Sequence, residues 1–232
     1  MNESEFDKFA DEYRHIHSLS IKASGEEPDF FAEYKIRDTA KILSKAGVTG
    51  NMRILDFGSG VGNSIPYFKR YLPNSELTCL DVSKKSLVLA EQRFSGDARF
   101  VSFDGTALPF PDEHFDVIFS ACVFHHIPHA KHLSILREWY RVLRHGGFAV
   151  IFEHNPLNPL TVRVVNACPF DNNAVLLTGK KMVCNFREAG FRTPYCHYRI
   201  FFPGQLRVFR VAEPFLSWLP LGAQYYVAAQ KN

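Results

Sequence analysis

The sequence predicts an α/β fold: a doubly wound, mostly parallel sheet of seven strands, with an antiparallel edge hairpin and an N-terminal helical cap. Between residues 50 and 155, short apolar runs alternate with helical patterns, which is typical of a parallel sheet covered by helices. Two further strand-like runs follow with no crossover helix between them, so they are expected to pair antiparallel at the edge. The length of 232 residues suits one such domain.

The cap is expected in residues 5–48, where side chains such as Phe31, Tyr34 and Ile42 recur at nearly helical spacing. Further along, Ser83 can cap a helix by accepting a backbone hydrogen bond, and Gly146-Gly147 is expected to end another helix. The alternation places strands at residues 53–57, 76–82, 98–103, 115–120 and 148–152, with helical patterns at 63–72, 84–94 and 133–143.

The C-terminal part is expected to hold a helix at 178–189 and strands at 197–202 and 224–229. The strands are separated by residues 203–221, an apolar insertion that contains Arg207 and Arg210. Three roles stay open for this insertion: packing in the core or in a homodimer, binding of a substrate, or peripheral contact with a membrane. The whole chain, residues 1–232, is expected to form a single domain: a cap or lid (1–48), a ligand-binding core (50–155) and a substrate side with the antiparallel edge (156–232).

Composition excludes several classes of protein. The net charge of +3 is small and the basic residues are scattered, which does not favour a nucleic-acid binder. Five cysteines without a Cys-x-x-Cys spacing predict neither a disulfide framework nor a metal site, and Cys79 and Cys122 are expected to be small core residues. With no recognisable signal peptide and no apolar run of about 18 residues, the sequence is expected to be cytoplasmic.

The most informative stretch is Asp56-Phe57-Gly58-Ser59-Gly60-Val61-Gly62, at the end of the first apolar run. Glycines in such a turn allow positive φ and let the backbone come close to a ligand. The helix predicted after the turn offers free N–H groups and a positive dipole end to an anion. The stretch therefore predicts a site for a nucleotide-like ligand.

Polar residues gather where the predicted strands end. Because ligands bind outside the carboxyl ends of parallel strands, these side chains are expected to converge on one ligand. Asp81 stands 19 residues after Gly62 (81 − 62), an offset that suits a carboxylate bound to ribose hydroxyls. Asp56 and Asp81 close the first two strands. The residues that follow the next three strands are Asp104, then His125 and His126, then Glu153 and His154.

Two features separate this turn from that of a dinucleotide-binding protein. Asn63 occupies the position of the third glycine, and the carboxylate of Asp56 would repel a pyrophosphate. A cationic sulfonium with a zwitterionic amino-acid tail suits a pocket lined by acids. S-adenosylmethionine is therefore the expected ligand.

Five segments together resemble a class I S-adenosylmethionine-dependent methyltransferase, which has a Rossmann-like sheet. They are residues 56–62, Asp81, residues 103–105, the run 108–118 (Leu-Pro-Phe-Pro-Asp-Glu-His-Phe-Asp-Val-Ile) and the run 141–147 (Arg-Val-Leu-Arg-His-Gly-Gly). The pattern is similar to the small-molecule branch, which includes ubiquinone-type and sugar- or lipid-modifying methyltransferases. Residues 153–178 also look similar to methyltransferases of bacterial surface-polysaccharide or lipid-linked pathways.

The resemblance implies roles for particular residues. Gly58, Ser59 and Gly60 would wrap the methionine part of the cofactor, Asp81 would hold the ribose, and Asp104 with Gly105 would meet the adenine. Asp56, Val82 and Ser120 complete the expected cofactor-binding set.

The implied reaction is methyl transfer to a small-molecule or lipid- or sugar-linked acceptor, with oxygen as the favoured atom. An oxygen acceptor must lose its proton, and His126 and His154 are the candidate bases because imidazole titrates near neutral pH. His125 is expected to point away from the pocket. Two alternatives stay open: an NAD-dependent oxidoreductase, although no Tyr-x-x-x-Lys or cysteine-based hydride-transfer site is visible, and a cofactor-binding protein without turnover.

Overall fold

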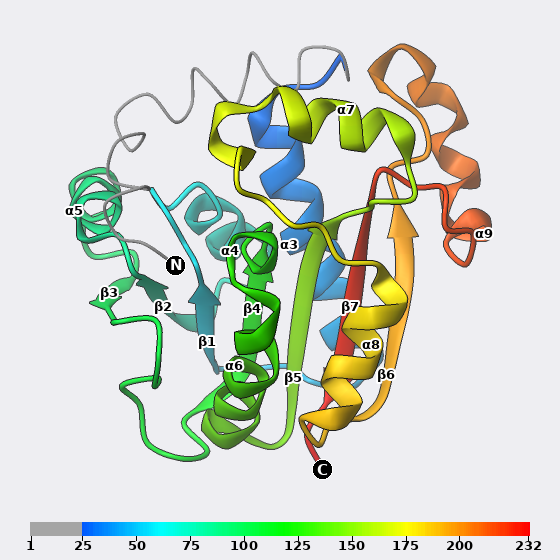
Figure 1. Ribbon diagram of the computed structural model, residues 1–232. Helices are drawn as coiled ribbons and strands as arrows, with labels where there is room; N and C mark the ends of the chain where they lie inside the picture. The colour runs from blue at the N-terminus through cyan, green and yellow to red at the C-terminus, as the bar shows by residue number, and fades with distance from the viewer. Residues whose placement is uncertain (1–24) are drawn as a thin grey trace.

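The computed structural model describes residues 25–232, so the part of the predicted cap before residue 25 lies outside the described residues. Seven strands form one sheet in the order β3-β2-β1-β4-β5-β7-β6 (Figure 1). The first five run parallel, and β7 pairs antiparallel with both β5 and β6, which confirms the predicted edge hairpin. The strands are β1 (Met52–Phe57), β2 (Ser75–Asp81), β3 (Arg99–Ser102), β4 (Phe115–Ala121), β5 (Leu143–His154), β6 (Arg192–Arg199) and β7 (Gln224–Gln230).

Helices cover both faces of the sheet, as Figure 1 shows. One face carries α3 (Pro28–Lys45) and α4 (Ile65–Tyr71), which bury Leu43 and Phe68 in one apolar cluster. The opposite face carries α6 (His129–Val142) and α8 (Gly179–Glu188), which bury Trp139, Met182 and Phe186 in a second cluster. Helix α5 (Lys84–Arg93) precedes β3. The Ser83 hydroxyl accepts from the Ser86 N–H at 3.1 Å, which confirms the predicted cap of this helix.

The prediction that Gly146-Gly147 ends a helix is wrong. Helix α6 ends at Val142, and β5 begins at once with Leu143, so both glycines lie inside a long strand. The register between β4 and β5 shifts here, and a Cβ on Gly147 would lie 2.8 Å from the carbonyl oxygen of Asp116. The glycines therefore allow an irregularity in the strand and a close approach of two backbones.

The last predicted boundaries also need correction. Strand β6 ends at Arg199 instead of continuing to residue 202, because Ile200 has φ +62° and turns the chain out of the sheet. The pattern analysis missed α7 (Pro159–Ala167) and the 3₁₀ turn η3 (Pro169–Asp171), which lie after β5. The insertion forms a 3₁₀ segment, η4 (Gly204–Ala212), followed by α9 (Glu213–Leu216). Across residues 25–232, no helix combines the length and apolar character needed to cross a bilayer.

Candidate functional site

A cavity of about 530 Å³ lies at the carboxyl ends of the parallel strands. In a doubly wound sheet this edge is where ligands bind, because strand ends and helix N-termini leave polar backbone groups there. The wall on one side comes from the turn after β1, and the other side comes from α3, α7 and η3. Polar residues on the wall include Lys35, Asp56, Asp81, Cys122, His125, His126, His154, Asn158, Asp171 and Gln224.

The turn after β1 depends on glycine at two positions. Gly58 has φ +76° and Gly60 has φ +52°, and both line the cavity. A Cβ on Gly58 would lie 2.4 Å from a methyl group of Val123, whereas one on Gly60 would meet nothing within 4 Å. The Gly58 N–H donates to the Leu80 carbonyl at 2.8 Å, which fixes the turn on β2. Backbone N–H groups are thereby brought to the cavity wall.

Asp56 is the most perturbed acid of the cavity. Its side chain is buried, and the Oδ2 atom has no hydrogen-bond partner among the described residues. Burial, with a smaller contribution from the neighbouring Asp81, raises the pKa of Asp56 to about 8. A buried carboxylate oxygen without a partner is costly, so this position fits a ligand that brings a positive charge or a donor.

Asp81 ends β2 and is tied to the glycine turn. Its Oδ2 atom accepts from the Gly60 N–H at 2.8 Å, and its Oδ1 atom accepts from the Ser83 N–H at 2.9 Å. The carboxylate is therefore oriented at the cavity wall beside Asp56.

The other expected cofactor residues lie differently. Ser59 lines the cavity, but Val82, Asp104, Gly105 and Ser120 are outside its lining. Asp104 accepts from the Thr106 N–H at 2.9 Å in a local turn, and Ser120 is fully buried.

The expectation that His125 points away from the pocket is wrong. His125 lines the cavity on the short 3₁₀ turn η2 (Phe124–His126), and its Nδ1 atom lies 2.6 Å from Glu153 Oε2. Burial alone would lower the pKa of His125, but Glu153 and Asp171 outweigh it and raise the pKa to about 10. The other oxygen of Glu153 accepts from the N–H groups of Val123 and Phe124, so this acid also fixes η2.

The two candidate bases both line the cavity. His126 Nε2 lies 3.4 Å from Asp171 Oδ1, and burial, reinforced by His125, lowers the pKa of His126 to about 4. The Nδ1 atom of His154 lies 3.4 Å from Gln224 Nε2, and its ring centre is 5.3 Å from that of His125. At neutral pH His126 is thus uncharged, and its lowered pKa makes it a weak proton acceptor.

A buried Lys35–Cys122 pair was missed by the sequence analysis. Lys35 of α3 is 7% exposed, and its Nζ atom lies 3.2 Å from Cys122 Sγ. Cys122 lines the cavity instead of packing as a core residue. Burial would raise the pKa of this thiol, but Lys35 and His154 outweigh burial and lower the pKa to about 6. The position of Cys122 directly after β4 could have indicated that it lines the site, because the other site residues also stand at strand ends.

This fold, with its cavity beside a glycine turn and strand-end acids, is similar to that of the class I S-adenosylmethionine-dependent methyltransferases. Residues 55–151 match the family model described as a methyltransferase domain. Over these residues the chain is similar to that class of enzymes.

Two curated relatives, both ubiquinone/menaquinone biosynthesis C-methyltransferases UbiE, come from Ectopseudomonas mendocina and Azotobacter vinelandii. They are 32% and 33% identical to this chain over 135 residues. The aligned part covers 55% of this chain, 52% of the first relative and 53% of the second. The chain thus spans about half the length of these relatives.

Solved structures share the fold at lower identity. A Thermotoga maritima S-adenosylmethionine-dependent methyltransferase, described as a possible histamine N-methyltransferase, has a TM-score of 0.69 at 18% identity, with 99% of both chains covered. Phosphoethanolamine N-methyltransferase 2 of Haemonchus contortus, in complex with S-adenosyl-L-methionine, has a TM-score of 0.66 at 16% identity, covering 97% of this chain and 60% of that one.

Proposed function

We propose that this chain is an enzyme that transfers the methyl group of S-adenosylmethionine to an oxygen of a small, lipid-soluble or lipid-linked acceptor. The observation that carries the proposal is the unpartnered Oδ2 atom of Asp56, buried beside the glycine turn and Asp81. This arrangement suits the amino group of the cofactor better than the pyrophosphate of a dinucleotide, which Asp56 would repel.

The residues of the cavity fit the parts of the cofactor. Asp56 would accept from the amino group, the turn of residues 58–60 would pack against the methionine part, and Asp81 would accept from the ribose hydroxyls. Asp104 and Gly105 stay proposed for the adenine side, and Val82 and Ser120 stay proposed as cofactor-binding residues without an assigned part of the cofactor. When bound, S-adenosylmethionine supplies a methyl group on a good leaving group.

The task of the chain is then to orient the acceptor, exclude water and remove one proton. The acceptor oxygen forms a bond to carbon as the carbon–sulfur bond breaks, and the sulfur keeps the electron pair. The hydroxyl proton passes to His154, with His126 the weaker candidate because its pKa is about 4; both histidines line the cavity. Correct positioning contributes up to roughly 7–11 kcal/mol to such reactions.

Methylation at carbon is the second candidate, favoured by the names of the curated relatives, which are C-methyltransferases. Removing a proton from a phenol-like acceptor by the same histidines would also activate a ring carbon. The two candidates differ in the bond formed, so they are separated by the product.

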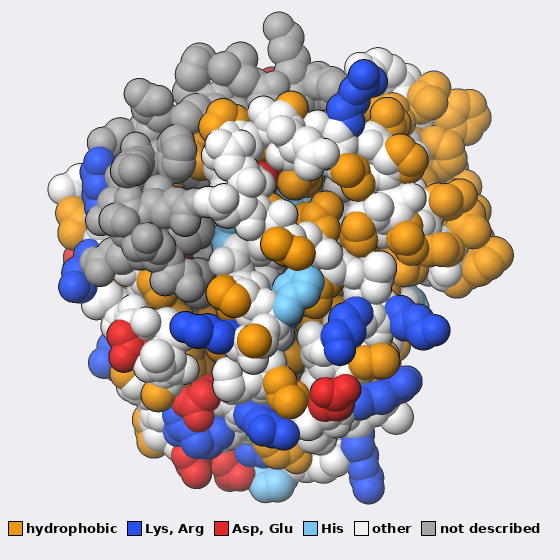
Figure 2. All heavy atoms as spheres, viewed as in Figure 1, with side chains coloured by type: hydrophobic (Ala, Val, Ile, Leu, Met, Phe, Trp, Pro, Cys, Tyr) orange, Lys and Arg blue, Asp and Glu red, His pale blue; other side chains and the backbone are white. Residues whose placement is uncertain are grey.

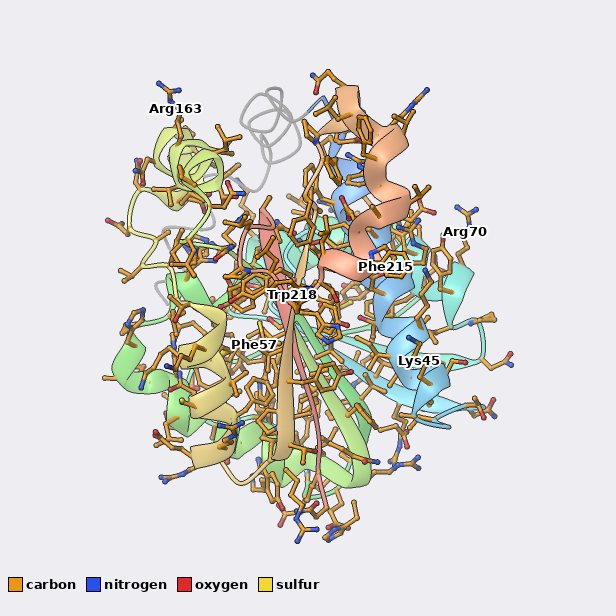
Figure 3. All side chains as sticks on the ribbon, turned by 90° about the vertical axis from the view of Figure 1, so that its right-hand side faces the viewer. Lys45, Phe57, Arg70, Arg163, Phe215 and Trp218 are labelled. Carbon is orange, nitrogen blue, oxygen red and sulfur yellow. The ribbon has the colours of Figure 1, made fainter. Side chains whose placement is uncertain are left out.

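An exposed apolar edge supports a lipid-linked acceptor. Of the twelve large hydrophobic side chains exposed in residues 25–232, seven lie in 204–221, among them Phe215 (80% exposed) and Trp218 (72%). Figure 2 shows hydrophobic side chains gathered over η4 and α9, and Figure 3 shows Phe215 and Trp218 on the β6 side of the molecule. We name residues 204–221 the apolar edge.

The charges of the apolar edge suit an anionic lipid surface. Arg207 is exposed, and the acid of the segment, Glu213, is buried, where it accepts from the Phe201 N–H at 2.9 Å. Arg163 projects from α7 at the same end of the molecule as η4 (Figure 3). Phe201 and Pro203, just before the edge, line the cavity, so an acceptor could pass from lipid to the site. We therefore propose a cytoplasmic enzyme that touches the membrane peripherally.

The experiment incubates the full chain with methyl-deuterated S-adenosylmethionine and a bacterial lipid extract. A product heavier by one labelled methyl group is expected. If the His154→Gln variant binds the cofactor as tightly as the wild type but forms none of this product, the result supports His154 as the base. Nuclear magnetic resonance of the product separates a methoxy group from a carbon-bound methyl group. Failure of the wild-type chain to bind S-adenosylmethionine by calorimetry would overturn the proposal.

A further inference from the structure

Three potential metal ligands meet on the cavity wall. The Nε2 atoms of His125 and His126 each lie 3.4 Å from Asp171 Oδ1, and all three ligand atoms fall within 4.8 Å of one another. His125 and His126 belong to η2, and Asp171 belongs to η3, which follows 45 residues after His126 (171 − 126). All three side chains line the cavity.

The two separations between a histidine nitrogen and Asp171 agree with a tetrahedral zinc site, and the two nitrogens lie within 4.8 Å of each other. Zinc–nitrogen and zinc–oxygen bonds of about 2.0–2.2 Å place two ligand atoms about 3.3–3.6 Å apart in a tetrahedron. The two measured distances of 3.4 Å satisfy this spacing.

Glu153 gives the cluster a second feature of metal sites. Histidine ligands commonly donate their other ring N–H to a carboxylate, which fixes the orientation of the ring. His125 has this arrangement, with Nδ1 2.6 Å from Glu153 Oε2 and Nε2 directed at Asp171. Glu153 is buried and bonded to the backbone of η2, so the ring is oriented before any ion arrives.

One backbone hydrogen bond joins η2 to the loop that follows η3, and a second one fixes η3 itself. The Val175 N–H donates to the His125 carbonyl at 2.8 Å, and the Asp171 N–H donates to the Cys168 carbonyl at 3.0 Å. These hydrogen bonds hold Asp171 close to η2, so the three side chains are already together without an ion.

We propose that His125, His126 and Asp171 bind a divalent zinc-class ion whose remaining coordination position faces the cavity. Two imidazoles and one carboxylate are ligands that zinc accepts, and three protein ligands with an open position are typical of catalytic zinc. The expectation of no metal rested on cysteine spacing, which does not test a histidine–carboxylate site. An acceptor hydroxyl held at the open position would lose its proton more readily.

The experiment titrates Co²⁺ into the full chain after removal of metals by a chelator. One equivalent is expected to bind more tightly than about 1 μM, or about −8.2 kcal/mol, with the visible absorption of a low-coordinate site. Competition by Zn²⁺ should abolish that absorption. Absence of stoichiometric binding in the wild type would overturn the proposal and leave the cluster as an ion pair of protonated His125 with two acids.

Variants separate a metal site from a folding effect. Asp171→Asn and His126→Gln are expected to weaken Co²⁺ binding at least tenfold, whereas Asp171→His, which keeps a ligand, should restore it. His145→Gln, whose side chain is 69% exposed, is the control and should bind as the wild type does. Undiminished Co²⁺ binding by Asp171→Asn would refute the assignment. Because S-adenosylmethionine binding is measured separately, failure of the metal site and failure of the proposed function are distinguishable.

Discussion

Asp56 links the stability of the protein to pH. Its pKa of about 8 in the folded chain lies above the ordinary value of 3.8, so the folded state keeps a proton that the unfolded chain releases. The contribution of Asp56 to the free energy of unfolding therefore falls as pH rises from about 4 to about 8. Asp56→Asn should raise the melting temperature at pH 8 by at least ~2–4 °C, the shift for about 1 kcal/mol, and change it less at pH 5.

Thermal melts of the cofactor-free protein at the two pH values measure this effect, with the exposed Asp112→Asn as control. The same Asp56→Asn variant should bind S-adenosylmethionine about tenfold or more weakly at pH 8, because a charge-assisted hydrogen bond is lost. A gain in stability together with a loss of affinity is the expected pair. Equal melting shifts at both pH values would argue against the raised pKa.

Cys122 should be the more reactive of two compared thiols. Its pKa of about 6 makes it mostly thiolate at pH 7, whereas burial raises the pKa of Cys196 to about 12. Alkylation followed by mass spectrometry should show the rate at Cys122 reaching half its plateau near pH 6, with Cys196 unmodified. Lys35→Met should move that midpoint upward, since the ammonium stabilises the thiolate. An unchanged midpoint would contradict the pairing.

At the scale of elements, the turn between β1 and α4 tests the role of glycine. Gly60→Ala should cost about 1–2 kcal/mol, the penalty for a left-handed backbone, because open space surrounds the added methyl group. Gly58→Ala should cost more, because its methyl group also collides with Val123. Urea unfolding measures both. Adding Val123→Ala should offset part of the Gly58→Ala loss and none of the Gly60→Ala loss; additive costs at both sites would oppose this view.

At the scale of the whole molecule, the apolar edge should bind vesicles that contain an anionic lipid. Phe215→Ser with Trp218→Ser should abolish most co-sedimentation, and Arg207→Gln should reduce the salt-sensitive part. Val88→Ser is the matched control, because Val88 is an exposed side chain (52%) on α5, outside the apolar edge. If the wild type ignores vesicles and the double variant instead turns a dimer into a monomer, the edge is a subunit contact.

The order and type of the core elements could be predicted because they follow from local patterns. Apolar runs of four to seven residues and the turn residues between them placed β1 to β4 to within two residues. Gly146 and Gly147 show the limit, because their use as strand residues depends on the approach of Asp116 from another strand. Helix α7 was not predicted, because residues 153–178 were interpreted only through their resemblance to other methyltransferases and not for their helical pattern.

For the site, the chain by itself determined that Asp56, Asp81, His126 and His154 stand at strand ends and so at one edge of the sheet. Tertiary structure decided which groups meet there: Asp171 reaches His125 across 46 residues (171 − 125), and Lys35 reaches Cys122 across 87. It also decided their charges, since charged neighbours from distant segments outweigh the effect of burial and so lower the pKa of Cys122 and raise that of His125. Strand ends are fixed by local periodicity, whereas burial and electrostatic coupling arise only once remote segments pack together.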